Sequence, residues 1–315
     1  MAPRVVSLIP SGTEIVAALG MLDTLVGRSH CCDYPPSVSA LPVLSRPKVD
    51  PSAPGAEVDR VVRDLMASGE SVYDILMGAL LAVKPDVVIT QDHCDACAVS
   101  LRDVEAAVAC AELAGARVCA LHPHDLAAVR EDFVRVATAL DAPQRGALLA
   151  RRFDERLERL RERTADVSHR PRVVLVEWLE PPMVAGGWIP ELARIAGLEP
   201  AIVTDADHFL QVGWGDLRDA EPDAIVVLPC GYTVDRTLAE LRGTEAGPRL
   251  ETLAEALPLG CWVVDGDALF NRPGPRLADS AELLASLFHP EAAAHLRAEG
   301  TELASGNGPA CRISA

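Results

Sequence analysis

Four cysteines stand in short polar segments, where a thiolate can act as a soft metal ligand or as a redox group. Cys94 and Cys97 form a Cys-x-x-Cys pair, a spacing that lets two thiolates reach one ion. Cys32 lies in another polar segment, nearer the N-terminus. Cys230 stands between Pro229 and Gly231, far along the chain. Four sulfurs suit zinc or an iron–sulfur cluster, whereas three leave a coordination position open for an incoming ligand. The predicted metal ligands are therefore Cys32, Cys94, Cys97 and Cys230.

The Cys94 and Cys97 pair has other interpretations. The same spacing is typical of redox dithiols, and either residue could be a loop thiol with no special role. The nearby His30 and His93 widen the choice of metal ligands. The chain has nine cysteines, an odd number, and it is too large to need disulfides. We therefore expect free thiols or metal ligands in a reducing compartment.

Other residue types point to ligand contact. Glu177 and Trp178 end a predicted strand, and a carboxylate at that position could act as an acid or a base. Trp188 and Trp214 stand in Gly-rich segments, where a Trp either covers a planar ligand or anchors a loop. Arg272 precedes the last predicted helix and faces either an anion or backbone carbonyls. We predict Glu177 as a catalytic candidate and the other four as cofactor-binding candidates.

The elements that must position these residues alternate between short apolar runs and amphipathic stretches, which predicts βαβ units and mainly parallel sheets. The predicted strands are Val5–Pro10, Thr24–Arg28, Asp86–Thr90, Arg117–Leu121, Arg172–Glu177, Ala201–Thr204, Ala224–Leu228 and Cys261–Val264. The predicted helices are Ser11–Leu19, Val58–Met66, Ser71–Val83, Leu101–Leu113, Asp125–Leu140, Gln144–Thr164, Ile189–Ile195 and Leu277–Phe288. The first of these helices opens on Ser11 and Glu14, the spacing of a capping box.

The fold class expected is α/β, with two Rossmann-like lobes. The helix Gln144–Thr164 is charged on most faces, as befits a rigid connector between domains. We assign residues 1–140 to an N-terminal lobe, 141–168 to the connecting helix and 169–315 to a C-terminal lobe. Lys84–Thr90 and Glu221–Val227 are similar in sequence, each with a proline that ends a helix just before a strand. Two lobes of like construction would bring the carboxyl ends of their strands, where ligands bind, to a shared cleft.

Charge and hydropathy exclude two classes of partner. The formal net charge of −17 argues against nucleic acid, whose binding depends on clustered Lys and Arg. No stretch approaches the roughly 18 apolar residues of a membrane span. The apolar run at Val5–Pro10 is too short for a signal peptide, so we expect a cytoplasmic protein.

The order of these segments resembles the class III substrate-binding proteins of ABC importers, and most closely the cobalamin-binding branch. The matching segments are Val6–Gly20, Leu25–Ser29, Lys84–Val88 and Asn271–Arg276, within a resemblance that covers about residues 4 to 290. The resemblance implies two α/β lobes joined by one long backbone helix, with the ligand between the lobes. It also implies transporter contacts through one acidic residue on each lobe, for which Glu191 and, less closely, Glu105 are the candidates.

The cysteines depart from the exported members of that family, since such thiols would oxidise outside the cell. We therefore expect a leaderless, cytoplasmic relative that binds a metal or metallocofactor in a Cys-lined cleft. The ligand could be a corrinoid, zinc or an iron–sulfur cluster, because thiolates are soft donors. The alternatives are a metalloenzyme on the same scaffold, with Glu177 as acid or base, and a redox protein based on Cys94 and Cys97.

Overall fold

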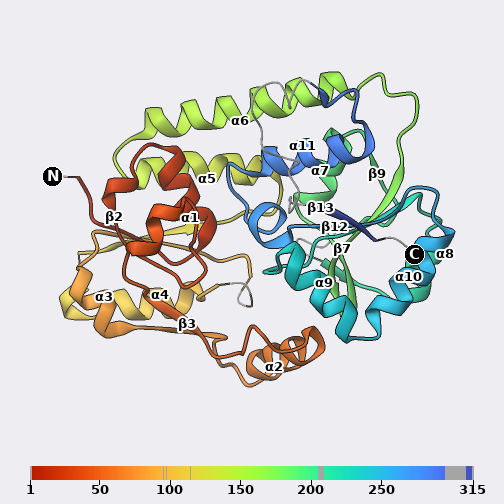
Figure 1. The fold of residues 1–315 in the computed structure, drawn as a ribbon. Helices are drawn as coiled ribbons and strands as arrows, with labels where there is room; N and C mark the ends of the chain where they lie inside the picture. The colour runs from red at the N-terminus through yellow and green to blue at the C-terminus, as the bar shows by residue number, and fades with distance from the viewer. Residues whose placement is uncertain are drawn as a thin grey trace. The chain divides into compact units, whose positions relative to one another are not determined.

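The chain forms two compact units, each described here by itself. The computed structural model describes residues 2–94, 96, 98–113, 115–204, 209–294 and 310–313. Unit 1 comprises Met1–Ala53 and Glu57–Phe153, and unit 2 comprises Pro54–Ala56 and Asp154–Ala315 (Figure 1). Each unit is an α/β fold with a sheet of largely parallel strands, which is the expected fold class.

The sheet of unit 1 has four parallel strands in the order β2-β1-β5-β6. The strands are β1 (Val5–Ser7), β2 (Leu25–Arg28), β5 (Val87–Gln91) and β6 (Arg117–Leu121). A separate antiparallel pair joins β3 (Ser45–Pro47) to β4 (Tyr73–Ile75). The helices are α1 (Pro10–Ala18), α2 (Gly55–Ala67), α3 (Met77–Val83), α4 (Leu101–Val108) and α5 (Leu126–Ala139), with 3-10 turns at Leu22–Thr24, Pro36–Ala40 and Ala111–Leu113. The first two residues of α2 belong to unit 2. Every residue of β5 is buried, as in a central parallel strand covered on both faces, although Thr90 and Gln91 are polar.

The sheet of unit 2, within the described ranges, has seven strands. They are β7 (Arg172–Leu179), β8 (Pro182–Ala185), β9 (Glu199–Pro200), β10 (Phe209–Gln211), β11 (Ala224–Val227), β12 (Gly260–Val264) and β13 (Ala310–Ile313). Strands β7, β11 and β12 are parallel neighbours, and the antiparallel strands β8, β10 and β13 extend the sheet on its two sides. The helices are α7 (Ile189–Ile195), α8 (Trp214–Asp219), α9 (Val234–Gly243), α10 (Ala246–Ala256) and α11 (Leu277–Phe288), with a π-helical turn at Gly266–Phe270.

Helix α6 (Pro143–Arg163) is 21 residues long and passes from unit 1 into unit 2. Its charged surface agrees with the helix predicted at Gln144–Thr164. In unit 2, Arg156 of α6 forms ion pairs with Asp279 and Glu282 of α11. Because Glu282 is almost completely buried, this pairing ties the second half of α6 firmly to α11.

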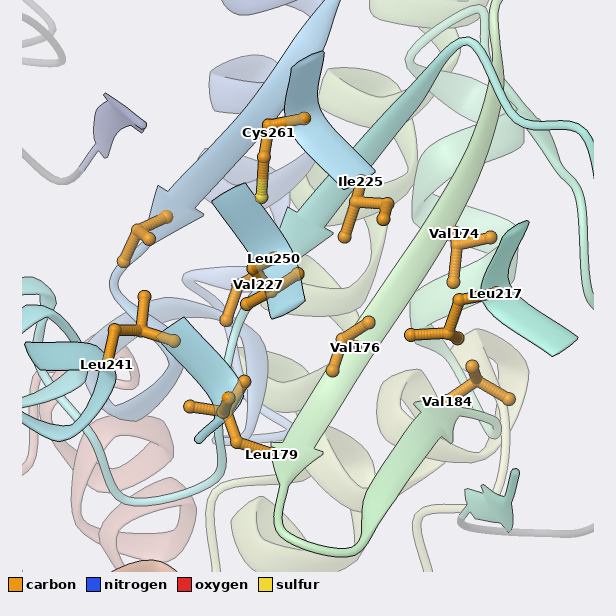
Figure 2. Packing of buried hydrophobic residues seen from close by; sticks show 13 residues of the cluster. Val174, Val176, Leu179, Val184, Leu217, Ile225, Val227, Leu241, Leu250 and Cys261 are labelled. Atoms are coloured by element: carbon orange, nitrogen blue, oxygen red, sulfur yellow. The ribbon is translucent and has the colours of Figure 1, made fainter. Parts of the chain in front are cut away.

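One hydrophobic core cluster of unit 2 lies on one face of the parallel strands. Side chains of β7, β11 and β12 point toward the same layer of helices, as Figure 2 shows for Val174, Val176, Ile225, Val227 and Cys261. Leu217 of α8, Leu241 of α9 and Leu250 of α10 close that layer. Cys261 is fully buried among these residues, and burial raises the pKa of its thiol to about 12.

The internal sequence similarity corresponds to the same backbone turn in both units. The residue before each proline, Lys84 or Glu221, has a positive φ, of 44° and 47° respectively. A left-handed residue ends a helix because it turns the chain away from the helical path. The proline that follows then prevents any continuation, so both segments terminate helices as predicted.

The aspartate that follows each proline ties two neighbouring strands together. Asp86 accepts a hydrogen bond from the Arg4 N–H through Oδ2 at 2.7 Å, and its own N–H donates to Arg4 O at 2.8 Å. In unit 2, Asp223 and Arg172 make the same reciprocal pair, at 2.8 Å and 2.7 Å. In each sheet, therefore, the same reciprocal pair of hydrogen bonds joins two neighbouring strands where they begin.

Three predicted elements differ from the structure. The capping box is wrong because α1 begins one residue earlier, at Pro10, with Ile9 as its N-cap and no side-chain cap. The helix predicted at Ser71–Val83 is split into β4 and α3, since its apolar residues also suit a short strand that pairs with β3. The strand predicted at Ala201–Thr204 is instead the two-residue β9, which precedes that range.

Candidate functional site

In unit 1, the carboxyl ends of β5 and β6 form a sheet edge that carries several polar side chains. In an open parallel sheet, ligands bind outside this edge. Residues Gln91 and Leu121 are paired in the last register of the two strands. The next residues along the chain, Asp92 and His122, therefore lie opposite each other, with Asp92 Oδ1 2.5 Å from His122 Nδ1.

Gln91 is 2% exposed, yet only one of the two polar atoms of its side chain has a hydrogen-bond partner among the described residues. Its Nε2 donates to Cys94 O at 2.5 Å, which positions the segment that follows β5. Within the part of the chain that the structure describes, its Oε1 is buried without a hydrogen-bond partner. A buried amide oxygen left unpaired costs free energy, and such an atom at a strand end points to a ligand or water as its partner.

The predicted metal ligands of unit 1 lie in different surroundings. Cys32 is completely buried, with its Sγ 3.0 Å from Thr13 Oγ1 and 3.1 Å from Ser29 Oγ. Its neighbour Cys31 is exposed and lies in a turn that the Cys32 N–H closes by donating to Ser29 O at 3.3 Å. Cys94 is half-buried, and Cys97 lies outside the described residues.

The metal site itself stays a prediction. Among the residues described, no group of three or more His, Cys, Asp and Glu side chains is arranged to hold a metal ion. Cys32 and Cys94 belong to unit 1, whereas Cys230 belongs to unit 2.

In unit 2, the carboxyl ends of β7 and β11 are joined through their backbones. The N–H of Cys230, three residues beyond β11, donates to Glu177 O at 3.1 Å. Glu177 and Cys230 are both half-buried, so both predicted residues stand at the edge where ligands bind in such sheets.

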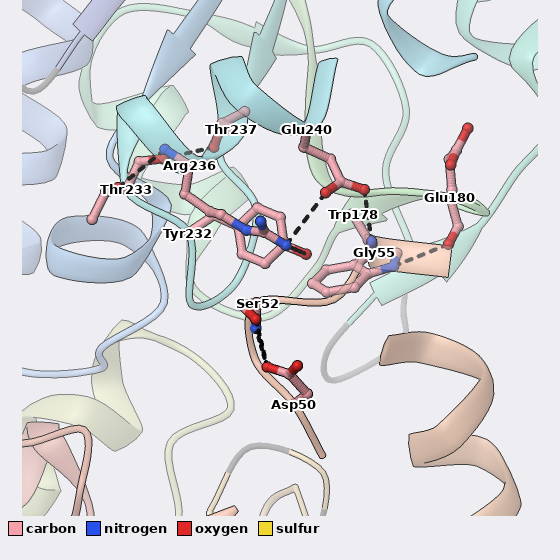
Figure 3. Close-up of polar contacts among 10 residues, drawn as sticks. All are labelled: Asp50, Ser52, Gly55, Trp178, Glu180, Tyr232, Thr233, Arg236, Thr237 and Glu240. Atoms are coloured by element: carbon pink, nitrogen blue, oxygen red, sulfur yellow. Dashed lines mark hydrogen bonds and ion pairs between the residues drawn. The ribbon is translucent and has the colours of Figure 1, made fainter. Parts of the chain in front are cut away.

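An aromatic group extends that edge. The rings of Trp178 and Tyr232 lie 5.3 Å apart, and the Arg236 guanidinium lies 4.8 Å from the Tyr232 ring centroid (Figure 3). Burial raises the pKa of the Tyr232 hydroxyl. Tyr232 is only 6% exposed, whereas Trp178 is half-buried, so Trp178 is the ring of this group with surface left for a planar ligand.

One buried carboxylate supports this aromatic group. Glu240, 3% exposed, pairs with Arg236 at 3.4 Å and accepts the Gly55 N–H at 2.6 Å (Figure 3). Burial, and then the charge of Glu240, raise the pKa of Glu180. Glu180 in turn lies close to Trp178, whose indole N–H donates to Glu180 O at 3.1 Å. Sequence reasoning selected Trp178 but missed Tyr232 and Glu240, since neither stands in a recognisable motif.

Arg272 is 5% exposed and pairs with Asp267 at 2.8 Å. Asp267 follows β12, and its N–H donates to Tyr232 O at 3.0 Å. Next to Arg272, Asn271 Nδ2 donates to Leu228 O and to Gly266 O. The predicted Arg272 thus belongs to a hydrogen-bonded strand-end structure, and its contact with a ligand stays a prediction.

The two other predicted tryptophans pack into unit 2. Trp188 is the N-cap residue of α7, is 7% exposed and donates its indole N–H to Phe270 O at 2.8 Å. Trp214 begins α8, packs against the core cluster and lies under Arg249. These contacts match the loop-anchor interpretation of a tryptophan, and a role of either residue in ligand binding stays a prediction.

Glu191 lies in the first turn of α7, and Glu105 is exposed on α4. Both positions are consistent with a surface contact, and the contact itself stays a prediction. None of the helices described combines the length with the apolar character that a membrane crossing demands.

Two α/β units, each with a parallel sheet whose strand ends carry polar and aromatic side chains, define a class of two-unit ligand-binding proteins. The chain matches the periplasmic binding protein family over residues 5–254. It therefore belongs to the periplasmic binding protein family, which confirms the resemblance seen in the sequence. Comparison with curated proteins gave no match.

Solved structures of similar fold agree with this assignment. The periplasmic heme-binding protein RhuT from Roseiflexus sp. RS-1 is 22% identical with a TM-score of 0.66, covering 93% of this chain and 100% of its own. A periplasmic heme-binding protein from Pseudomonas aeruginosa is 22% identical with a TM-score of 0.69, covering 92% and 94%. The vitamin B12 binding protein BtuF of Vibrio cholerae is 21% identical with a TM-score of 0.63, covering 91% and 96%. At this identity the likeness concerns the fold.

Proposed function

We propose that this protein binds a metal-containing tetrapyrrole, of the haem or corrinoid class, as its ligand. The observation that carries the proposal is the strand-end edge of unit 1, where Gln91, Asp92 and His122 present polar atoms beyond what the fold requires. Gln91 Oε1 is buried and unpaired among the described residues, and the His122 side chain is 40% exposed. Oxygen and imidazole nitrogen are the donors that such an edge would offer to a ligand.

Family membership supports a binding protein, and the relatives support the ligand class. The structures of similar fold include proteins named for binding heme and vitamin B12, two ligands that share a metal in a macrocycle. In unit 2, the half-buried ring of Trp178, packed on the buried Tyr232, is an aromatic surface of the kind that suits a macrocycle. In this proposal the metal arrives with the ligand, and the protein contributes donors and stacking surfaces.

The test is a binding titration of the purified full-length protein, followed by absorption spectroscopy and by quenching of tryptophan fluorescence. The probes are ferric protoporphyrin IX, aquacobinamide, metal-free protoporphyrin IX and zinc ions alone. The proposal expects saturable binding of at least one of the two metal-containing macrocycles, at least tenfold tighter than binding of the metal-free porphyrin. Equal affinity for the metal-free porphyrin, or binding of zinc alone, would overturn it.

A variant pair connects the binding to the edge of unit 1. Gln91→Leu removes the amide that holds Cys94 O, so we expect at least tenfold weaker binding. Gln144→Leu, an exposed position on α6, is the matched control and should bind like the parent protein. Thermal unfolding of both variants shows whether the fold survives, and equal affinities would contradict the placement of the site.

Two of the predicted cysteines, Cys94 and Cys230, enter the proposal as additional donors. Cys94 stands beside the carboxyl end of β5, and Cys230 beside that of β11, so each could reach a ligand at its own edge. Replacing Cys94 and Cys97 together by Ser should then weaken binding or change the spectrum of the bound metal. The cytoplasmic location expected from cysteine usage likewise stays a prediction.

A further inference from the structure

His122 is held in one orientation by contacts on both its ring and its backbone. Its Nδ1 lies 2.5 Å from Asp92 Oδ1, and its N–H donates to Asp132 Oδ2 at 3.0 Å. Asp132 is 1% exposed and is itself fixed by Arg135, whose Nε donates to Oδ1 at 2.9 Å. The Asp92 N–H donates to Leu121 O at 3.1 Å, so the orienting carboxylate is tied to the same strand end.

The contact with Asp92 selects the tautomer of the neutral His122 imidazole. In the neutral ring, the proton stays on Nδ1, where the Asp92 carboxylate accepts it. The lone pair is then on Nε2, at the outer side of the ring. Among the described residues, Nε2 has no hydrogen-bond or ion-pair partner, and the side chain is 40% exposed. A carboxylate behind one ring nitrogen and a free lone pair on the other is the arrangement of metal-ligating histidines.

Other histidines of the chain have ring contacts that serve the fold. His30 stacks on Tyr73 and bonds to Ser45 Oγ at 2.9 Å, and burial lowers its pKa. The ring of His289 contacts Gly197 O at 3.0 Å. His124 is the instructive neighbour, because its Nδ1 only contacts the nearby carbonyl of His122, at 3.0 Å. His122 alone among these four is oriented by a carboxylate at hydrogen-bond distance.

We propose that His122 Nε2 coordinates the metal of the bound ligand, and that Asp92 is its positioning residue. The imidazole nitrogen would replace a water on the iron or cobalt, so the metal keeps its coordination number. The Asp92 carboxylate strengthens the bond by making the imidazole a better donor. This inference rests on the proposed function, and it adds a nitrogen ligand for the metal to the sulfur donors named there.

The experiment compares the absorption spectra of bound ferric protoporphyrin IX and bound aquacobinamide in the parent protein, His122→Ala and His124→Ala. The parent protein should show the band shift that follows replacement of metal-bound water by imidazole. His122→Ala should lose that shift and bind about tenfold or more weakly. His124→Ala should match the parent protein. Added free imidazole should restore the band to the His122→Ala complex.

Asp92→Asn tests the positioning role. The amide can still accept from Nδ1 but has no charge, so we expect about tenfold weaker binding. The reduction potential of bound haem should rise, because a less electron-rich imidazole stabilises the oxidised metal less. An unchanged potential would overturn the role assigned to Asp92.

The outcomes separate this inference from the proposed function. If the parent protein binds neither metal-containing probe, the proposed function fails and this inference fails with it. If the parent protein binds a probe and His122→Ala gives the same spectrum, the inference alone is overturned. Loss of the band in His124→Ala would also overturn it, because the effect would then belong to the loop and not to the oriented ring.

Discussion

His289 Nε2 lies 3.0 Å from Gly197 O, a contact that joins the end of α11 to the turn after α7. Gly197 has a φ of +84°, in the left-handed region that glycine tolerates best. A Cβ at this position would come within 3.0 Å of the His289 ring and 3.1 Å of Thr164 Cβ. The imidazole is thus packed against backbone, where a positive charge is poorly solvated.

This packing predicts a pH-dependent stability. Burial is the main cause that lowers the pKa of His289; the Gly197 contact opposes it, and the charges of Arg170 and His169 lower the pKa further by smaller amounts. A histidine with a lowered pKa in the folded state takes up its proton more readily when unfolded. Its contribution is therefore present above about pH 6.5 and is lost as the pH falls below that value. The free energy of unfolding should decline between pH 7 and 5, and less steeply in His289→Gln. Equal pH slopes in urea denaturation would contradict this.

Gly266 is required by its closeness to a neighbouring strand end. A Cβ there would lie 2.3 Å from Pro229 O and 2.5 Å from the Leu228 carbonyl. Backbone cannot yield as a side chain can, so Gly266→Ala should cost about 1–3 kcal/mol or more of stability. Gly243→Ala, with open space around it, is the control and should change stability little. Chemical denaturation measures both, and similar losses would count against the close packing.

Asp86 and Asp223, which each join two neighbouring strands within one sheet, give a matched pair of variants. Asp86→Ala removes the acceptor of the Arg4 N–H, and Asp223→Ala removes that of the Arg172 N–H. Each should reduce the free energy of unfolding by about 1–2 kcal/mol, because a backbone donor loses its charged partner. Asp64→Ala, whose ion pair with Arg60 is fully at the surface, should cost far less. A neutral result at both Asp86 and Asp223 would mean that the shared pair of hydrogen bonds does not stabilise the sheets.

Thiol reactivity should divide the cysteines by burial. Cys31 is exposed and should react with iodoacetamide in the folded protein. Burial raises the pKa of Cys119 to about 11 and that of Cys261 to about 12, so both should react only after unfolding. Cys32, fully buried, should behave like them. Peptide mapping by mass spectrometry reads out each site, and rapid labelling of Cys261 in native protein would refute the described core.

Most of the parallel strands could be predicted, because the sequence of a buried strand contains a continuous apolar run. Val87–Ile89 is such a run, within the strand predicted at Asp86–Thr90 and observed at Val87–Gln91. Short antiparallel additions such as β8 and β10 escaped prediction, because three or four residues carry too little pattern. Ser71–Val83 failed for a related reason, since its apolar positions fit a helix and a strand equally over a few residues.

Part of the candidate site could be predicted from the rule that functional residues lie just after the carboxyl ends of parallel strands. That rule selected Glu177, Trp178 and Cys94, which do stand at such ends. The same rule applies to His122, which directly follows the strand Arg117–Leu121, but its partner became evident only from the register between two strands. Pairing between distant residues such as Gly55 and Glu240 leaves no local signal at all.

The placement of Pro54–Ala56 in unit 2 has a practical consequence for anyone who would cut the chain in two. The Gly55 N–H and the carboxylate of Glu240 are 185 residues apart in sequence yet only 2.6 Å apart in space. A recombinant fragment that starts at Asp154 would leave that carboxylate without its backbone donor. Its missing piece is a tripeptide, so a short synthetic peptide added in trans is the natural means to complement such a fragment.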